Sequence, residues 1–195
     1  LGYLGTELCR IYSGESWKNK IIAIDNRFIS ERVSELNNWN IEFFQGELFD
    51  SNFLKKHLYD ADVVHHLAGI TDVAYTKSQS NLELDNKIRT TAVTGTNNIL
   101  KSINKNCKLI FPSTHVIFEG LQKTKKNILE DEVPKPILTY SVSKVQNEKD
   151  ITNSDINYII LRLGSVYGYS HDTMRLNIMP NLFSKITSQN GNIKL

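Results

Sequence analysis

Short apolar, β-branched runs alternate along the chain with longer segments of helical periodicity. Five of these runs predict strands, and their near-continuous hydrophobicity is typical of strands covered on both faces, as in a parallel sheet. They occupy residues 20–25, 41–45, 62–68, 108–113 and 157–163. The remaining periodic stretches predict helices near residues 4–13, 51–59, 82–104, 139–152 and 174–187. Strands that alternate with helices in this order indicate βαβ units, so we expect an α/β fold with a doubly wound parallel sheet.

The composition is that of an ordinary globular protein and argues against several other classes. The 195 residues are 40% hydrophobic and 23% charged, and the formal net charge of +2 is too small to suggest a nucleic-acid partner. No apolar run approaches the roughly 18 residues needed to span a bilayer, so we expect no membrane partner. The two cysteines, Cys9 and Cys107, form neither a disulfide framework nor a metal-ligand spacing. We therefore expect a cytoplasmic protein without a metal site.

The first residues carry two glycines in front of a helical segment. In LGYLG, Gly2 and Gly5 flank Tyr3 and Leu4, and the helical stretch TELCRIY follows. Glycines at this spacing let the backbone approach a pyrophosphate closely, and the helix N-terminus then presents its N–H groups to the anion. A helix–strand packing contact would also account for two glycines, so this motif alone leaves both interpretations open.

Asp25 ends the apolar run IIAID, roughly 20 residues after Gly5, where dinucleotide-binding proteins carry an acid. A carboxylate there can accept both ribose hydroxyls of an adenosine and repels a 2′-phosphate, which favours NAD over NADP. The alternative is that Asp25 caps the next helix. Asn26 and Arg27 follow, and a cationic Arg27 could accept a 2′-phosphate, so NADP remains the less favoured cofactor.

Small and polar residues also gather at the other strand ends, which is where open α/β sheets bind ligands. These ends read GEL (46–48), HLAG (66–69), PSTH (112–115) and GSVYG (164–168), with YSVSK (140–144) before the last. With the glycine turn, this ordered string resembles the extended short-chain dehydrogenase/reductase family, the NAD-dependent epimerases and dehydratases that act mainly on nucleotide sugars. The resemblance covers almost the whole chain. It implies a Rossmann fold whose first strand falls before Leu1 and most of whose substrate lobe falls after Leu195.

The resemblance also implies which residues hold the cofactor. It places Asp25 at the adenosine ribose and Glu47 with Leu48 at the adenine edge. HLAG would pass beside the phosphates and the nicotinamide ribose, and Lys144 would also contact that ribose. The implied cofactor residues are Gly2, Tyr3, Leu4, Gly5, Asp25, Asn26, Glu47, Leu48, Leu67, Ala68, Gly69, Tyr140 and Lys144.

The catalytic residues implied by the resemblance are Thr114, Tyr140 and Lys144. Residues four apart on a helix share a face, so Tyr140 and Lys144 can both point at the nicotinamide. A phenol with an ordinary pKa of about 10 is a poor base at neutral pH, and a nearby ammonium favours its phenolate form. Thr114 would position the substrate oxygen for proton transfer.

The expected substrate contacts are Thr71, His115 and Ser165. Dehydratases of the family carry an Asp–Glu pair directly after the catalytic threonine, whereas this chain has His115 and Val116, which disfavours elimination. The stretch STHVIFEG is instead similar to the STDYVFDG pattern of deoxysugar reductases. Whether His115 contacts the substrate or is an exposed spectator stays open.

We therefore expect an NAD-dependent nucleotide-sugar epimerase that works through hydride transfer to NAD and a keto-sugar intermediate. The alternatives are a reductase of a keto-sugar nucleotide and a non-catalytic dinucleotide sensor on the same fold. Residues 1–168 would form the NAD-binding domain and residues 169–195 the start of the substrate lobe. We expect the full-length protein to be a homodimer, and these 195 residues alone neither to turn over substrate nor to bind NAD tightly.

Overall fold

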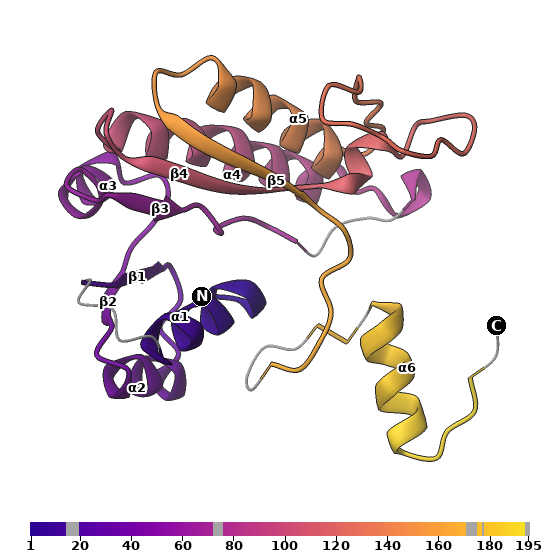
Figure 1. Cartoon of the computed structure of the whole chain (residues 1–195), viewed down its shortest axis with the longest axis horizontal. Helices are drawn as coiled ribbons and strands as arrows, with labels where there is room; N and C mark the ends of the chain where they lie inside the picture. The colour runs from indigo at the N-terminus through magenta and orange to yellow at the C-terminus, as the bar shows by residue number, and fades with distance from the viewer. Residues whose placement is uncertain (15–19, 72–75, 171–174, 177, 194–195) are drawn as a thin grey trace. The chain divides into compact units, whose positions relative to one another are not determined.

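The computed structural model describes residues 1–14, 20–71, 76–170, 175–176 and 178–193. The chain divides into two compact units (Figure 1). The first consists of Leu1–Gln45 with Ser165–Leu195, and the second of Gly46–Gly164.

The first unit contains a parallel pair of strands. Strand β1 (Ile22–Asp25) pairs with β2 (Glu42–Gln45). Its helices are α1 (Tyr3–Gly14), α2 (Ser30–Asn38) and α6 (Met179–Ser188). The small core of this unit is made of side chains from α1, β1, α2 and the residue before β2, namely Cys9, Ala23, Leu36 and Ile41.

Helix α2 was not predicted from the sequence. Only Val33 and Leu36 are apolar in SERVSELNN, so the hydrophobic period is too weak to stand out. The helix forms because Leu36 is fully buried in the core of the first unit. It ends at Asn38, and Asn40, with a φ of 58°, lets the Ile41 amide turn back to the Leu36 carbonyl at 2.9 Å.

The second unit is a three-stranded parallel sheet covered by helices. Its strands, in the order β3-β4-β5, are β3 (Val63–His65), β4 (Lys108–Thr114) and β5 (Asn157–Leu163). The α-helices are α3 (Ser51–Leu58), α4 (Leu82–Ser102) and α5 (Thr139–Thr152). Two short 3-10 helices, η1 (Lys77–Gln79) and η2 (His115–Phe118), lie in the connections. Figure 1 shows α4 and α5 on the same face of this sheet.

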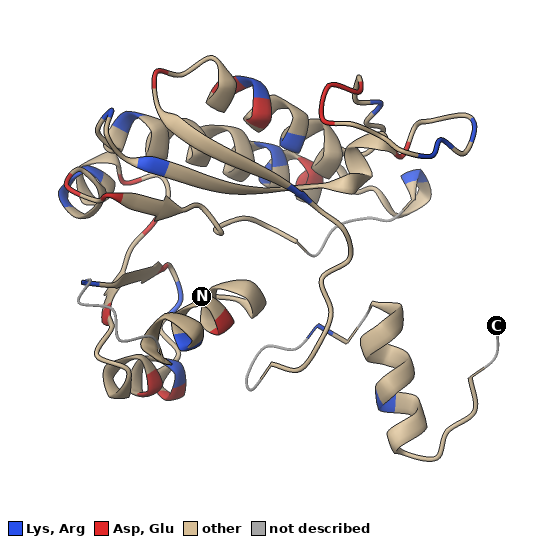
Figure 2. Ribbon diagram, in the orientation of Figure 1, with Lys and Arg blue, Asp and Glu red and all other residues tan. Residues whose placement is uncertain are grey.

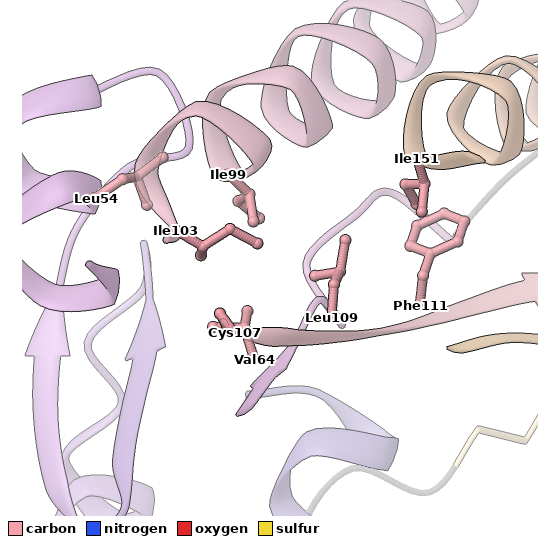
Figure 3. Close-up of a cluster of buried hydrophobic side chains, with 8 residues drawn as sticks. All are labelled: Leu54, Val64, Ile99, Ile103, Cys107, Leu109, Phe111 and Ile151. Atoms are coloured by element: carbon pink, nitrogen blue, oxygen red, sulfur yellow. The ribbon is translucent and has the colours of Figure 1, made fainter. Parts of the chain in front are cut away.

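The core of the second unit lies between β4 and these helices (Figure 3). Alternate residues of β4 are buried, and Leu109 and Phe111 point toward the helices. They meet Ile99 of α4 and Ile151 of α5. Burying each such side chain stabilises the fold by about 1.5–3 kcal/mol, so this layer fixes α5 against β4.

The predicted parallel α/β architecture is confirmed. The structure gives β5 and α5 the predicted bounds, whereas β3 is shorter than expected and ends at His65. Residue 174, where the last helix was expected to begin, lies outside the described residues, and α6 begins at Met179. None of the helices within the described ranges has the length and apolar character of a transmembrane segment. Acidic and basic residues are interspersed on the ribbon of both units (Figure 2).

Candidate active site

Thr114 is the last residue of the central strand of the second unit. Its side chain is buried, and its hydroxyl oxygen accepts a hydrogen bond from the Val116 amide at 3.3 Å, which caps η2. In the parallel register Thr114 lies opposite Leu163, so β4 and β5 end together. The hydroxyl therefore lies at the carboxyl edge of the sheet, which is the edge that binds ligands in open α/β folds.

Helix α5 carries Tyr140 in its first turn and Lys144 one turn later. The Lys144 ammonium donates a hydrogen bond to the Pro112 carbonyl of β4 at 2.7 Å. It lies 4.3 Å from the ring centroid of Phe111 and 5.7 Å from that of Tyr140, whose side chain is half-buried. Because the ammonium contacts β4 two residues before Thr114, the helix face with the Tyr–Lys pair is turned toward the end of this strand.

The Lys144 ammonium is mostly buried, and this changes its acidity. Burial lowers the pKa of Lys144 to about 8, and the carboxylate of Glu148 opposes that shift. Glu148 itself is buried and accepts hydrogen bonds from the Ser113 hydroxyl and from Arg162, whose Nη2 lies 2.8 Å away. The same hydrogen bond raises the pKa of Arg162. A buried ionic network thus lies one helical turn beyond the candidate catalytic lysine.

His66, the first residue after β3, is buried beneath this edge. Its Nε2 lies 2.9 Å from the Thr96 hydroxyl of α4, and its ring centroid lies 5.5 Å from that of Phe111. In the amide orientation that satisfies both of its ends, Asn147 of α5 accepts from the same threonine at 3.2 Å. Burial, followed by the charge of Lys144, lowers the pKa of His66 to about 3. A neutral imidazole of this kind packs behind the site and has no acid–base role at ordinary pH.

The segment after His66 leaves the sheet toward solvent. Leu67 is half-buried, while Ala68, Gly69 and Thr71 are exposed. A Cβ atom added at Gly69 would meet nothing within 4 Å, so the backbone here is open to a ligand.

Two other segments, expected to contact the substrate or the cofactor, make contacts within the protein. The ring of His115 is exposed, and its Nδ1 lies 3.1 Å from the carbonyl oxygen of Leu163. This contact connects His115 to the end of β5. Leu48 packs on α4 so closely that a Cβ atom at Gly95 would come within 2.8 Å of it. Glu47 is exposed. The Leu48 side chain therefore supports the core, and a cofactor contact at this residue would fall to its backbone.

The predicted glycine turn lies in the first unit, at the start of α1. Gly2 precedes the helix, and a Cβ atom at this position would meet nothing within 4 Å. Gly5 is buried in the first turn, and Leu4 is exposed. The phenol of Tyr3 donates a hydrogen bond to the Gly168 carbonyl at 2.7 Å. The first-turn amides at the open end of α1 have no acceptors within the helix and can serve an anion.

Asp25 lies beside this turn, at the end of β1. Its carboxylate lies beside Leu1 and accepts a hydrogen bond from the Arg27 amide at 2.9 Å. Asn26 and Ser165 are exposed in the same unit. This unit therefore brings the predicted ribose acid and the predicted pyrophosphate turn together.

Sequence reasoning missed the ionic and hydrogen-bonding groups that support the candidate site. Glu148 lies four residues after Lys144 on the same helix, so helical spacing could have found it. Its partner Arg162, and Glu119 near the start of α5, carry no comparable local signal. Within the described residues, no cluster of three or more His, Cys, Asp or Glu side chains could hold a metal ion.

Comparison with known proteins decides the family. Residues 1–195 match the model of the NAD dependent epimerase/dehydratase family over their whole length. The chain belongs to this family. The CDP-paratose 2-epimerase of Salmonella typhi is 34% identical over 139 residues, which are 66% of this chain and 39% of that relative. The resemblance stated from the sequence motifs is thereby confirmed.

Solved structures of similar fold include members named as epimerases. The UDP-glucuronic acid 4-epimerase from Bacillus cereus, as a mutant in complex with a fluorinated UDP-glucuronic acid and NAD, matches with a TM-score of 0.78 at 22% identity. That match covers 100% of this chain and 62% of the other. The UDP-glucose 4-epimerase from Thermotoga maritima, with UDP-glucose, gives 0.75 at 21% identity over 100% and 62%. At these identities the likeness shows the Rossmann-type fold, and this epimerase/dehydratase chain spans only part of each relative.

Proposed function

We propose that the protein is an NAD-dependent epimerase of a nucleotide sugar. The observation that carries the proposal is the placement of Tyr140 and Lys144 on the face of α5 that contacts the end of β4, where Thr114 lies. Family membership supports it, as do similar structures named as UDP-sugar 4-epimerases. We also place the boundary between the NAD-binding domain and the substrate lobe at residue 168.

The residues present fit NAD as the cofactor. The open space over Gly2 and the free amides at the start of α1 suit a pyrophosphate, and the adjacent Asp25 carboxylate suits the adenosine ribose. Gly69 leaves room for the phosphates or the nicotinamide ribose. The chemistry that NAD supplies in this family is reversible hydride transfer, and the protein's own groups must manage the proton.

Tyr140 is the proposed proton carrier. Its phenolate takes the proton of a sugar hydroxyl while the carbon that bears this hydroxyl gives its hydride to the cofactor. The phenol returns the proton when the hydride is delivered back to the opposite face of that carbon. The Lys144 ammonium, 5.7 Å from the phenol ring, stabilises the phenolate. Thr114 hydrogen-bonds the reacting sugar oxygen and orients it.

A reductase of a keto-sugar nucleotide is the second candidate, because it would use the same three side chains. The observation that favours it is the stretch STHVIFEG (113–120), which is similar to the STDYVFDG pattern of deoxysugar reductases, with His115 where they have Asp. The two reactions differ in redox balance, because a reductase consumes NADH and an epimerase does not. A non-catalytic sensor would need none of Thr114, Tyr140 and Lys144.

Replacing the phenol tests the proposal. In the full-length protein, Tyr140→Phe should lower kcat for epimerisation of UDP- or dTDP-sugars by at least about 100-fold, because general acid–base catalysis is lost. NAD affinity, measured by calorimetry, should change less than about twofold, since one phenol contact contributes little to cofactor binding. Tyr59→Phe, at an exposed tyrosine after α3, is the matched control and should behave as wild type. Turnover retained in Tyr140→Phe would refute the assignment, and net NADH consumption by the wild type would identify the reductase.

A further inference from the structure

A compact set of hydrogen bonds joins the segment after Thr114 to the segment before Tyr140. The Gly120 amide donates to the Lys135 carbonyl at 2.8 Å, and the Lys135 amide donates to the Ile117 carbonyl at 2.8 Å. The two backbones are so close that a Cβ atom at Gly120 would lie 2.4 Å from the Lys135 carbonyl oxygen. The end of η2 and the loop leading into α5 therefore form one hydrogen-bonded corner.

Glu119 lies at the centre of this corner. Its Oε1 accepts hydrogen bonds from the Ile137 amide at 2.8 Å, the Leu138 amide at 2.7 Å and the Ser141 hydroxyl. Leu138 is the N-cap residue of α5, and its apolar side chain makes no capping bond. The first turn of α5 also contains no acidic residue. Glu119 thus supplies from another element both the acceptor and the negative charge that stabilise a helix N-terminus.

We infer that Glu119 is a positioning residue that sets Tyr140 in place relative to Thr114. η2 begins directly after Thr114, and Tyr140 lies within the turn that Glu119 holds. Docking that turn on η2 fixes the phenol against the strand end that carries the hydroxyl. The inference rests on the proposed function, in which Tyr140 carries the proton. A displacement of about 1 Å between reacting groups can lower turnover by roughly 100-fold, so the position of this phenol matters.

Three variants of Glu119 in the full-length protein test this role. Glu119→Ala removes the acceptor and should lower kcat by about 30-fold or more while the KM for the nucleotide sugar stays within about twofold. Glu119→Gln keeps an Oε1 acceptor and should restore kcat to within about threefold of wild type. Glu119→Asp keeps the charge but withdraws it by one methylene, so kcat should fall between those two values. Glu132→Ala is the matched control, because this nearby carboxylate pairs with Lys125.

Amide hydrogen exchange gives a readout that does not depend on activity. The amides of Ile137 and Leu138 should exchange at least about 10-fold faster in Glu119→Ala and at near wild-type rates in Glu119→Gln, because only the first variant removes their acceptor. If Glu119→Ala does not fold, the same comparison is made between Glu119→Asp and wild type.

The outcomes separate this inference from the proposed function. Wild-type kcat in Glu119→Ala or Glu119→Asp, with turnover lost in Tyr140→Phe, would overturn the positioning role and leave the epimerase standing. A wild-type protein without epimerase or reductase activity would overturn the proposed function, and with it the effect on kcat. Exchange rates of Ile137 and Leu138 that are unchanged in Glu119→Ala would refute the hydrogen-bonded corner itself.

Discussion

At the scale of the residue, Lys144 is the most constrained group of the candidate site. Its ammonium is mostly buried, yet it contacts the Pro112 carbonyl and the face of the Phe111 ring, and the charge of Glu148 one turn away stabilises its protonated form. These partners stabilise the cation only in part, because burial still lowers the pKa of Lys144 to about 8 from 10.5. A cation held this way is available to a phenolate at neutral pH.

This lowered pKa makes a prediction for stability against pH. Below pH 8 the amine is protonated in the folded and unfolded states alike, and the fold carries the full cost of a buried charge. Between the folded pKa of about 8 and the unfolded pKa of about 10.5, the unfolded state binds more protons, so the contribution of Lys144 to stability rises with pH. The free energy of unfolding of wild type minus that of Lys144→Met should therefore increase across this window, by at most about 1.4 kcal/mol per pH unit.

Urea denaturation of both proteins at pH 7, 8, 9 and 10 measures that difference. Lys149→Met is the control, because Lys149 is exposed on the same helix and its difference from wild type should stay flat. A difference for Lys144→Met that is flat or falls with pH would contradict a buried, weakened cation.

At the scale of the element, α5 is fixed by ionic and hydrogen-bonded contacts as well as by its apolar face. Glu148 joins this helix to β4 through the Ser113 hydroxyl and to β5 through Arg162. The two charges are largely buried, with 24% of the Arg162 side chain and 9% of the Glu148 side chain exposed. Their removal should affect the whole packing of α5 against the sheet.

Arg162→Met should lower the free energy of unfolding by about 3 kcal/mol, because it leaves the buried Glu148 carboxylate without its cation. The double variant Arg162→Met with Glu148→Met should cost less than the single one, since the buried Glu148 carboxylate is then no longer left without Arg162. Lys105→Met provides the comparison, because its pair with Asp155 is 78% and 82% exposed and should be worth under about 1 kcal/mol. Denaturant titration of the three variants decides the point. Equal losses for Arg162→Met and Lys105→Met would show that the Arg–Glu pair is not desolvated.

The elements that the sequence predicted are those whose signals are local. β5 and α5 have the expected bounds because a continuous apolar run and a helical period define them without reference to the rest of the chain. α2 was missed because Leu36 is its only buried apolar residue, which gives no helical period of apolar positions. The contacts of Glu119 join residues 18 to 22 positions apart, and those of Glu148 with Ser113 span 35. No periodicity reports such pairs, whereas Thr114, Tyr140 and Lys144 lie in short motifs that can be recognised in one sequence.

At the scale of the whole molecule, the proposed roles divide between the two units. The first unit holds the glycine turn and Asp25, which are proposed to bind the adenosine end of NAD. The second holds Thr114 and Tyr140, which are proposed to act on the sugar, and Lys144, which is proposed to stabilise the Tyr140 phenolate. Variants of the glycine turn or of Asp25 should therefore change cofactor affinity, and variants of Thr114 or Tyr140 should change turnover.

Asp25→Asn tests the cofactor half of this division. The variant keeps the size of the side chain but removes the charge that accepts the ribose hydroxyls, so the Kd for NAD should rise by about 10-fold or more in the full-length protein. The preference for NAD over NADP should narrow at the same time, because an amide does not repel a 2′-phosphate. At saturating NAD, kcat should stay within about twofold of wild type.

Thr114→Ala should show the converse pattern, with a lowered kcat and an unchanged Kd for NAD, since its hydroxyl is proposed to contact only the sugar.

Glu42→Gln is the control for Asp25. It removes an exposed carboxylate, paired with Lys20, from the amino end of the neighbouring strand and should alter neither quantity. Calorimetry with NAD and NADP gives the Kd values. If Asp25→Asn bound NAD as tightly as wild type, the carboxylate at the end of β1 would be a helix-capping group and not the ribose acid, and the preference for NAD would have to come from other residues.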